Sequence, residues 1–122
     1  MEIMGKSVIL EKSEDFALRI VKLYQHLVSK EEGREFVLSK QLLRSGTSIG
    51  ANVAEAQYAI SRSDFNSKMY ISLKEANESL YWLRLLYKAG YLSEPEFNSL
   101  YNDCEELLKI LISITKTVKE NK

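Results

Sequence analysis

The sequence predicts an all-α protein, an antiparallel up-down-up-down four-helix bundle in which residues 1–122 form a single domain. Apolar residues recur every three or four positions along four long segments, which is the helical period. The breaks between these segments are short, and short breaks favour antiparallel neighbours. One proline and five glycines leave little material for the many turns of an all-β fold.

The predicted helices cover residues 10–29, 36–60, 64–89 and 94–119, and residues 30–35 are a polar connection. Each helix has an inward row of apolar or small residues spaced by three and four. The four rows are Phe16, Ile20, Leu23 and Leu27; Val37 or Leu38, Leu42, Ile49, Val53 and Ala56; Phe65, Met69, Ser72, Ala76, Leu80, Leu83 and Leu86; and Phe97, Leu100, Cys104, Leu107, Leu111, Ile114 and Val118.

Capping residues support the breaks between the helices. Ser61 or Ser63 is the expected N-cap of the third helix. Gly90 is the expected left-handed residue just past the end of that helix. Ser93 stands three residues before Glu96, with the proline between them, which is the capping-box pattern at the start of the fourth helix.

Composition and charge exclude several classes of protein. The 17 basic and 17 acidic side chains give a net charge of zero, which removes the strongest sequence argument for a nucleic-acid binder. A single cysteine excludes an internal disulfide framework and a cysteine-based zinc cluster. The N-terminus has no signal-peptide pattern, and the sequence has no run of about 18 apolar residues that could span a bilayer. We therefore expect a cytoplasmic protein with no membrane partner.

Small residues interrupt the second helix. Gly46 and Gly50 lie one helical turn apart, with Ala54 one turn further, and each glycine costs about 1 kcal/mol relative to alanine within a helix. Tight helix packing, in the bundle or between subunits, is the interpretation we favour; a ligand groove and a local kink are the alternatives. No strand precedes the glycines and no Gly-Lys-Ser/Thr follows them, so a phosphate-binding loop is not supported.

Polar side chains share faces of the second and third helices. If the two faces meet, buried charges there are expected to pair, and we predict a buried polar network. A solvated face is one alternative, and a binding or metal site around the three glutamates is another. The predicted network comprises Arg44, Ser48, Asn52, Glu55, Glu75 and Glu78.

The sequence offers no catalytic constellation. His26 is the only histidine and Leu23 stands three residues before it, so the Glu-x-x-His motif of di-iron bundles is missing. Cys104 falls on the apolar row of the fourth helix, where a buried structural thiol is the expectation. No Gly-x-Ser-x-Gly elbow is present. We expect no enzyme activity, no cofactor and no metal site.

The third helix carries a slight excess of basic residues, which makes it the candidate for contact with nucleic acid. The candidate contacts are Arg62, Lys68, Lys74, Arg84 and Lys88. The chain also has seven tyrosines, not all of which can point inward, and exposed tyrosines favour self-association.

Three segments resemble a known family. They are Leu42-Leu43-Arg44-Ser45-Gly46-Thr47-Ser48-Ile49-Gly50-Ala51-Asn52-Val53-Ala54-Glu55-Ala56, Ser63-Asp64-Phe65, and Leu73-Lys74-Glu75-Ala76-Asn77-Glu78 with Tyr81-Trp82-Leu83. In these segments the chain resembles the four-helix-bundle proteins encoded in bacterial 23S rRNA intervening sequences. The positions that match the family motif are Arg44, Ser48, Asn52, Glu55, Asp64 and Glu75, and no catalytic role is attached to them. Gly50 stands where many relatives have proline, and Ala56 where they have glycine.

The resemblance implies an antiparallel bundle that assembles as a ring-shaped homo-oligomer, typically a pentamer. Relatives include the accessory proteins of diversity-generating retroelements, which bind nucleic acid through a basic surface and partner a reverse transcriptase. This chain is neutral and departs from them there. Together, sequence and resemblance indicate a non-enzymatic, self-assembling scaffold or adaptor whose partners are itself and RNA or an RNA-associated protein. The alternative is direct RNA binding through the weakly basic face of the third helix.

Overall fold

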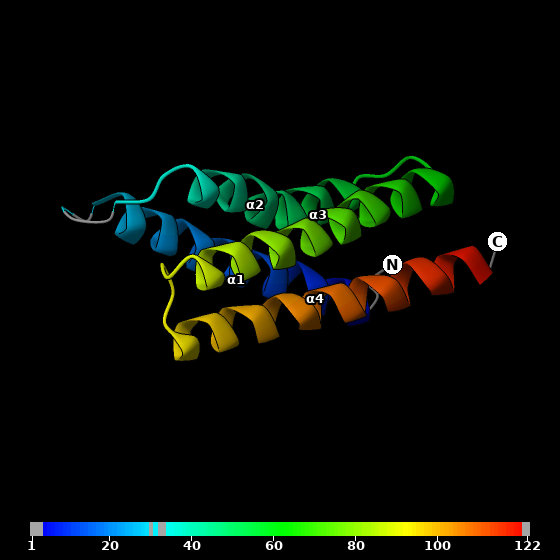
Figure 1. The fold of residues 1–122 in the computed structure, drawn as a ribbon. Helices are drawn as coiled ribbons and strands as arrows, with labels where there is room; N and C mark the ends of the chain where they lie inside the picture. Colours follow the sequence, from blue (N-terminus) through cyan, green and yellow to red (C-terminus); the bar gives the residue numbers. More distant parts are fainter. Residues whose placement is uncertain (1–3, 30, 32–33, 121–122) are drawn as a thin grey trace.

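The computed structural model describes residues 4–29, 31 and 34–120, and places the side chains of all of these except 4–7 and 118–120. The helices are α1 (Met4–Ser29), α2 (Leu38–Ala56), α3 (Arg62–Lys88) and α4 (Glu94–Glu120). Figure 1 shows consecutive helices side by side and running in opposite directions. The fold is the predicted all-α four-helix bundle.

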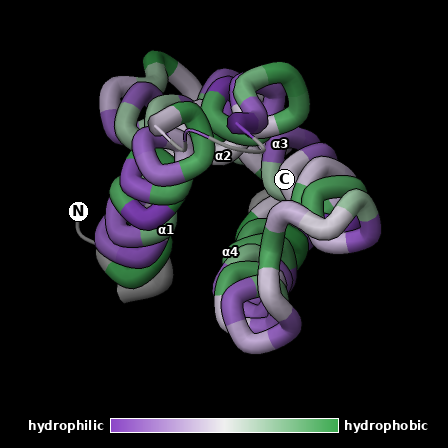
Figure 2. The backbone as a smooth tube through the Cα atoms, turned by 60° about the vertical axis from the view of Figure 1, so that its left-hand side comes forward, coloured by the Kyte–Doolittle hydropathy of each residue, from purple (hydrophilic) through white to green (hydrophobic). Residues whose placement is uncertain are grey.

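Neighbouring helices are not packed equally. The α2–α3 pair has the most extensive contact, and α1 meets α4 least. In Figure 2, α1 and α4 diverge from the α2–α3 pair. Two ion pairs join these diverging helices, Lys12 with Glu106 at 3.3 Å and Arg19 with Asp103 at 2.5 Å.

Burial follows the predicted rows. Most row positions are buried, and Leu23, Leu38, Phe65, Phe97 and Ile114 are partly buried against the same core. Val37 is 64% exposed, so Leu38 is the member of that predicted pair that packs inward. Val118 lies outside the described side chains.

Two predicted helix boundaries are wrong by several residues. The first helix starts at Met4 rather than at residue 10, and Ile9, which is fully buried, extends its apolar row. The second helix ends at Ala56 rather than at residue 60. Past this end, backbone hydrogen bonds join residues three apart, in place of the four of an α-helix. Tyr58 N–H donates to Glu55 O at 3.0 Å, and Ala59 N–H donates to Ala56 O at 3.2 Å.

The predicted signals between α3 and its neighbours are confirmed. Ser61 is the N-cap of α3, and its Oγ accepts the N–H of Asp64 at 2.9 Å. Gly90 has a φ of 91°, and the N–H of Tyr91 donates to Leu86 O at 2.9 Å, which closes a Schellman turn.

The predicted capping box is also present at the start of α4. The N–H of Ser93 donates to Glu96 Oε1 at 3.0 Å. In return, the N–H of Glu96 donates to Ser93 Oγ at 3.3 Å. These reciprocal bonds satisfy two backbone donors, one of them in the first turn of α4.

Sequence reasoning missed the residue that starts α2. Glu35, placed in a polar connection, is 7% exposed, and its carboxylate accepts three backbone N–H groups. The donors are Val37 at 2.9 Å, Leu38 at 2.8 Å and Ser39 at 2.7 Å. A carboxylate at this position satisfies the free donors of the first turn and complements the helix dipole.

Candidate functional site

Gly46 and Gly50 bring α2 close to α1. A Cβ atom on Gly46 would lie 3.1 Å from Cγ1 of Ile20, and one on Gly50 would lie 3.3 Å from the carbonyl oxygen of Ser13. These glycines therefore serve packing inside the bundle. Ala54, which was predicted to share this role, is exposed.

Arg44 of α2 reaches two carboxylates of α3. Its guanidinium pairs with Glu75 at 3.3 Å and also with Glu78. Glu78 in turn accepts the indole N–H of Trp82 at 2.8 Å. Side-chain hydrogen bonding to Trp82 and to Arg44 lowers the pKa of Glu78, although burial opposes it.

The other predicted network residues do not join this cluster. Lys68 pairs with Glu55 at 3.0 Å, nearer the corner between α2 and α3. Ser48 donates to Arg44 O at 2.6 Å and Asn52 donates to Ser48 O at 2.9 Å, so both bond the backbone of their own helix.

The predicted network is not buried in this structure. The side chains of Arg44 and Glu55 are 49% and 63% exposed, because α2 and α3 turn them outward beside their contact. Exposed ion pairs of this kind contribute little stability, typically below 1 kcal/mol. Among the described residues, no group of three His, Cys, Asp or Glu side chains is placed to hold a metal ion.

The five basic residues proposed for nucleic-acid contact do not form one patch. Arg62 and Lys88 are the first and last residues of α3, which places them roughly 39 Å apart at the helical rise. Lys68 faces Glu55 of α2. Only Lys74 and Arg84 line the same hollow.

That hollow is a groove between α3 and α4 with a volume of about 600 Å³, and we call it the α3–α4 groove. Its walls combine apolar, aromatic and basic side chains. They include Leu73, Lys74, Tyr81 and Arg84 of α3 and Leu108 and Ile112 of α4. Tyr81 is 47% exposed and Ile112 is 48% exposed, so the groove offers apolar surface to solvent.

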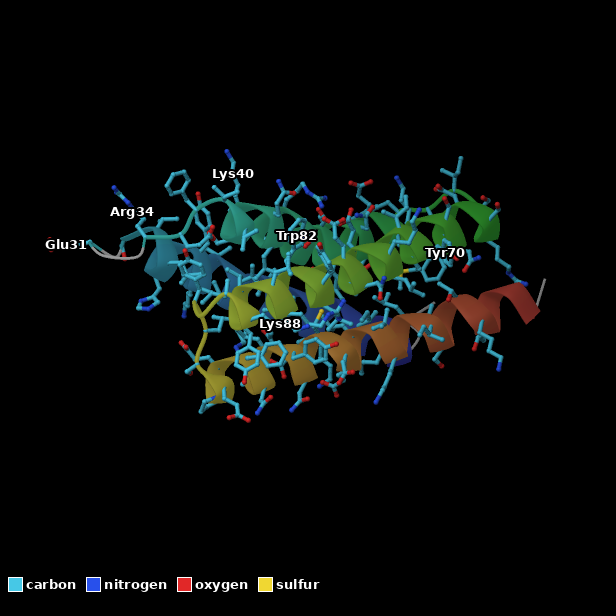
Figure 3. The ribbon with its side chains drawn as sticks, in the orientation of Figure 1. Glu31, Arg34, Lys40, Tyr70, Trp82 and Lys88 are labelled. Carbon is cyan, nitrogen blue, oxygen red and sulfur yellow. The ribbon has the colours of Figure 1, made fainter. Side chains whose placement is uncertain are left out.

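Neighbouring aromatic contacts hold the wall of the groove. Tyr81 packs edge-on against Trp82 with ring centroids 5.0 Å apart. The Arg84 guanidinium lies 6.0 Å from the centre of the Tyr81 ring and donates to the Tyr101 hydroxyl at 3.0 Å. Figure 3 shows Tyr70, another exposed tyrosine, and Trp82 along the same helix.

A second exposed apolar feature lies where α2 meets α3. Tyr58 and Ile60 are 88% and 94% exposed, the highest values among the large apolar side chains that the structure describes. We call this pair the α2–α3 corner. Sequence reasoning missed it because both residues were assigned to the second helix, although the Ser61 capping signal pointed to a turn just there.

A smaller hollow of about 330 Å³ lies between α1 and α4. Lys22, Leu23 and His26 line it from α1, and Glu96 and Leu100 from α4. His26 is exposed there. Cys104 is buried in the core, and its Sγ donates to Ala76 O at 3.3 Å.

The fold and these surfaces define an all-α four-helix-bundle protein with exposed apolar features and ion-paired polar clusters. No described helix has a stretch that is long and apolar enough to cross a membrane. The model of the 23S rRNA-intervening sequence protein family matches residues 5–113. The chain belongs to this family.

A solved structure agrees with this assignment. The chain is similar to a protein of unknown function from the S23 ribosomal protein family of Bacteroides thetaiotaomicron, with 54% sequence identity and a TM-score of 0.88. The match covers 93% of this chain and 99% of that one. No curated protein matches the chain.

Proposed function

We propose that this protein is a non-enzymatic scaffold or adaptor that assembles from several copies of itself through the α3–α4 groove. The observation that carries the proposal is the apolar surface that Tyr81 and Ile112 present there to solvent. Association that buries such apolar surface is favoured by about 25 cal/mol for each Å² removed from water. Tyrosine is enriched at interfaces because it combines a large apolar body with a polar tip.

The polar clusters fit a scaffold better than an active site. The Arg44 guanidinium and the Trp82 indole already occupy Glu78, and Lys68 occupies Glu55. We therefore propose that the clusters hold α2 against α3. A closed homopentameric ring is the assembly we propose for this scaffold, in line with the family resemblance.

The mass in solution tests the proposal. Light scattering of the purified protein at micromolar concentration is expected to give a multiple of the 14.0 kDa subunit mass. The variant Tyr81→Ser/Ile112→Ser is expected to dissociate. Leu18→Ser is the matched control, since Leu18 is 54% exposed on α1, away from the groove. A wild-type monomer would overturn the proposal.

A second candidate, direct RNA binding, is favoured by one observation on the outward face of α3. Tyr70, Lys74, Tyr81 and Lys88 follow one another at intervals of four, seven and seven residues, which places them on one face of the helix, and Figure 3 shows Tyr70 and Lys88 toward its opposite ends. Lys74 and Lys88 have no ion pair among the described residues. Aromatic rings that stack on bases, interleaved with cations, are typical of single-strand binding.

Salt dependence tests this candidate. Anisotropy of a fluorescent single-stranded RNA is expected to show binding that weakens steeply with salt, because phosphate contacts release counterions. Lys74→Gln/Lys88→Gln is expected to reduce both the affinity and the salt slope. Lys22→Gln/Lys40→Gln removes the same charge from α1 and α2 and serves as the control. Affinity that is unaffected by salt, or equal loss in both variants, would contradict the assignment.

A further inference from the structure

We infer that the α3–α4 groove of one copy receives the α2–α3 corner of a second copy, with Tyr58 and Ile60 of that copy seated against Tyr81 and Ile112. This inference rests on the proposed self-assembly and names the element that fills the groove.

Hydrogen bonds hold the backbone of the corner in place. The N–H of Ile60 donates to Asp64 Oδ2 at 3.1 Å, and the N–H of Tyr58 donates to Glu55 O at 3.0 Å. The cap of α3 by Ser61 follows immediately. The backbone of such a turn loses little conformational freedom on docking, which lowers the entropic penalty of association.

Covering both apolar features requires a contact between unlike surfaces. The corner lies at one end of the bundle, whereas the groove lies along the middle of α3, opposite residues 108 and 112 of α4. A two-fold contact of groove with groove would leave Tyr58 and Ile60 in water. Corner in groove covers both features on every copy through a single kind of interface.

The size of the two features fits this arrangement. A hollow of about 600 Å³ accommodates a large aromatic and a branched aliphatic side chain, and a tyrosine alone buries roughly 150–250 Å². A stable interface needs roughly 800 Å² on each partner. The first turns of α3 beside the corner and Tyr70 beside the groove extend the contact toward that area.

Charge favours the same pairing. The groove is lined by Arg84 and by Lys74, which has no ion pair among the described residues. The groove's carboxylate, Glu78, is already held by α2 and by Trp82. Near the corner, Glu55 pairs with Lys68 through Oε1, and its side chain is 63% exposed, so a cation of the groove can bind the same carboxylate as a second partner.

A contact between unlike surfaces propagates. Each copy then offers one corner and one groove, so assembly proceeds to a closed ring or an open filament and does not stop at a dimer. The same logic gives a way to trap a dimer. A copy that lacks its corner still has a groove, and a copy that lacks its groove still has a corner. These two copies can form one interface with each other, and neither has a second surface with which to bind another copy.

The test uses the full chain and two double variants. Tyr58→Ser/Ile60→Ser removes the corner, and Tyr81→Ser/Ile112→Ser removes the groove; circular dichroism confirms that each retains its helices. Light scattering is expected to show each variant alone at the 14.0 kDa subunit mass. Mixed one to one, they are expected to give twice that mass and no larger species.

Other outcomes separate this inference from the proposed function. Wild-type protein that is monomeric overturns both. Wild-type oligomers that persist in the corner variant overturn the inference and leave self-assembly intact. If both variants are monomeric alone and remain monomeric when mixed, the inference is also overturned. The intact groove of one variant should bind the intact corner of the other, whereas a two-fold contact would not be restored by mixing. Leu18→Ser, which keeps both the corner and the groove, is the control for an exposed apolar-to-serine change and is expected to assemble as the wild type does.

Discussion

Glu35 and Ser39 bind each other reciprocally at the start of α2. The N–H of Ser39 donates to Glu35 Oε1 at 2.7 Å, and the Ser39 hydroxyl donates to Glu35 O at 2.9 Å. Because the carboxylate is buried and serves three backbone donors, Glu35→Gln is expected to lower the free energy of unfolding by about 1–2 kcal/mol. Urea unfolding measures this. Glu31→Gln, at an exposed position, is the control, and an equal effect there would contradict the capping role.

The Glu35 carboxylate also makes the free energy of unfolding depend on pH. Burial raises the pKa of Glu35, but the hydrogen bonds from Leu38, Ser39 and Val37 outweigh it, and the pKa lies below its usual 4.5. A group whose pKa is lowered by folding stabilises the protein above its unfolded pKa, and this contribution is lost as pH falls through the folded value. We expect the urea midpoint of the wild type to approach that of Glu35→Gln below pH 4. A constant difference at all pH values would contradict this.

Trp82 reports the protonation of Glu78. It is the one tryptophan of the chain, and its indole N–H donates to the Glu78 carboxylate. Tryptophan fluorescence is therefore expected to titrate below pH 4.5, the ordinary value for this carboxyl, because its pKa is lowered. Arg44→Gln is expected to move this transition to higher pH, and Glu78→Gln to abolish it. A transition that survives in Glu78→Gln would assign it to another group.

Gly46 is expected to tolerate no side chain without loss of stability. Alanine there gains about 1 kcal/mol of helix propensity, but overpacking against Ile20 costs about 1–3 kcal/mol. Ile20 is buried and β-branched, so its side chain has little freedom to move away from a new methyl group. We expect Gly46→Ala to lower the free energy of unfolding by about 1 kcal/mol. Ala51→Gly, at an exposed site of the same helix, is the control: it measures the difference in helix propensity between alanine and glycine without a change in packing.

A double-mutant cycle isolates the steric part of that effect. Combining Gly46→Ala with Ile20→Ala is expected to destabilise by less than the sum of the single changes, because the new methyl group occupies space that Ile20 vacates. Strict additivity would show that the two positions do not press on each other.

Cys104 is expected to be inert until the bundle opens. Burial, followed by the charges of Glu105 and Asp103, raises the pKa of its thiol to about 12. Since the thiolate is the reactive form, labelling at pH 8 should be far slower than for an exposed thiol, and its rate should rise with urea as unfolding does. Fast labelling of the native protein would show that α4 opens locally.

Local chemistry made most of the fold predictable. Ser61, Gly90 and Ser93 act through bonds to residues within five positions, so the sequence around them was enough to place the breaks. The end of α2 was missed because Tyr58 and Ile60 continue an apolar pattern yet lie in solvent. Glu35 was missed because a glutamate in a polar stretch carries no local sign that it folds back on α2.

The candidate site was predictable in composition but not in arrangement. Helical spacing put Arg44, Glu75 and Glu78 on facing helices, and the structure brings them together. Spacing says nothing about the rotation of two helices against each other, and that rotation decides whether such a cluster lies inside or at the rim. The α3–α4 groove was missed for a similar reason, since it depends on where α4 lies beside Tyr81.

The limited contact between α1 and α4 has a consequence for how the chain folds. The larger helix interfaces all join elements that follow one another along the chain, so they form by closing short loops. Topologies of this kind fold fast, because little chain entropy is lost before native contacts form. Each helix can also dock on its predecessor as the chain leaves the ribosome, and the seam between the first and last helices closes at the end.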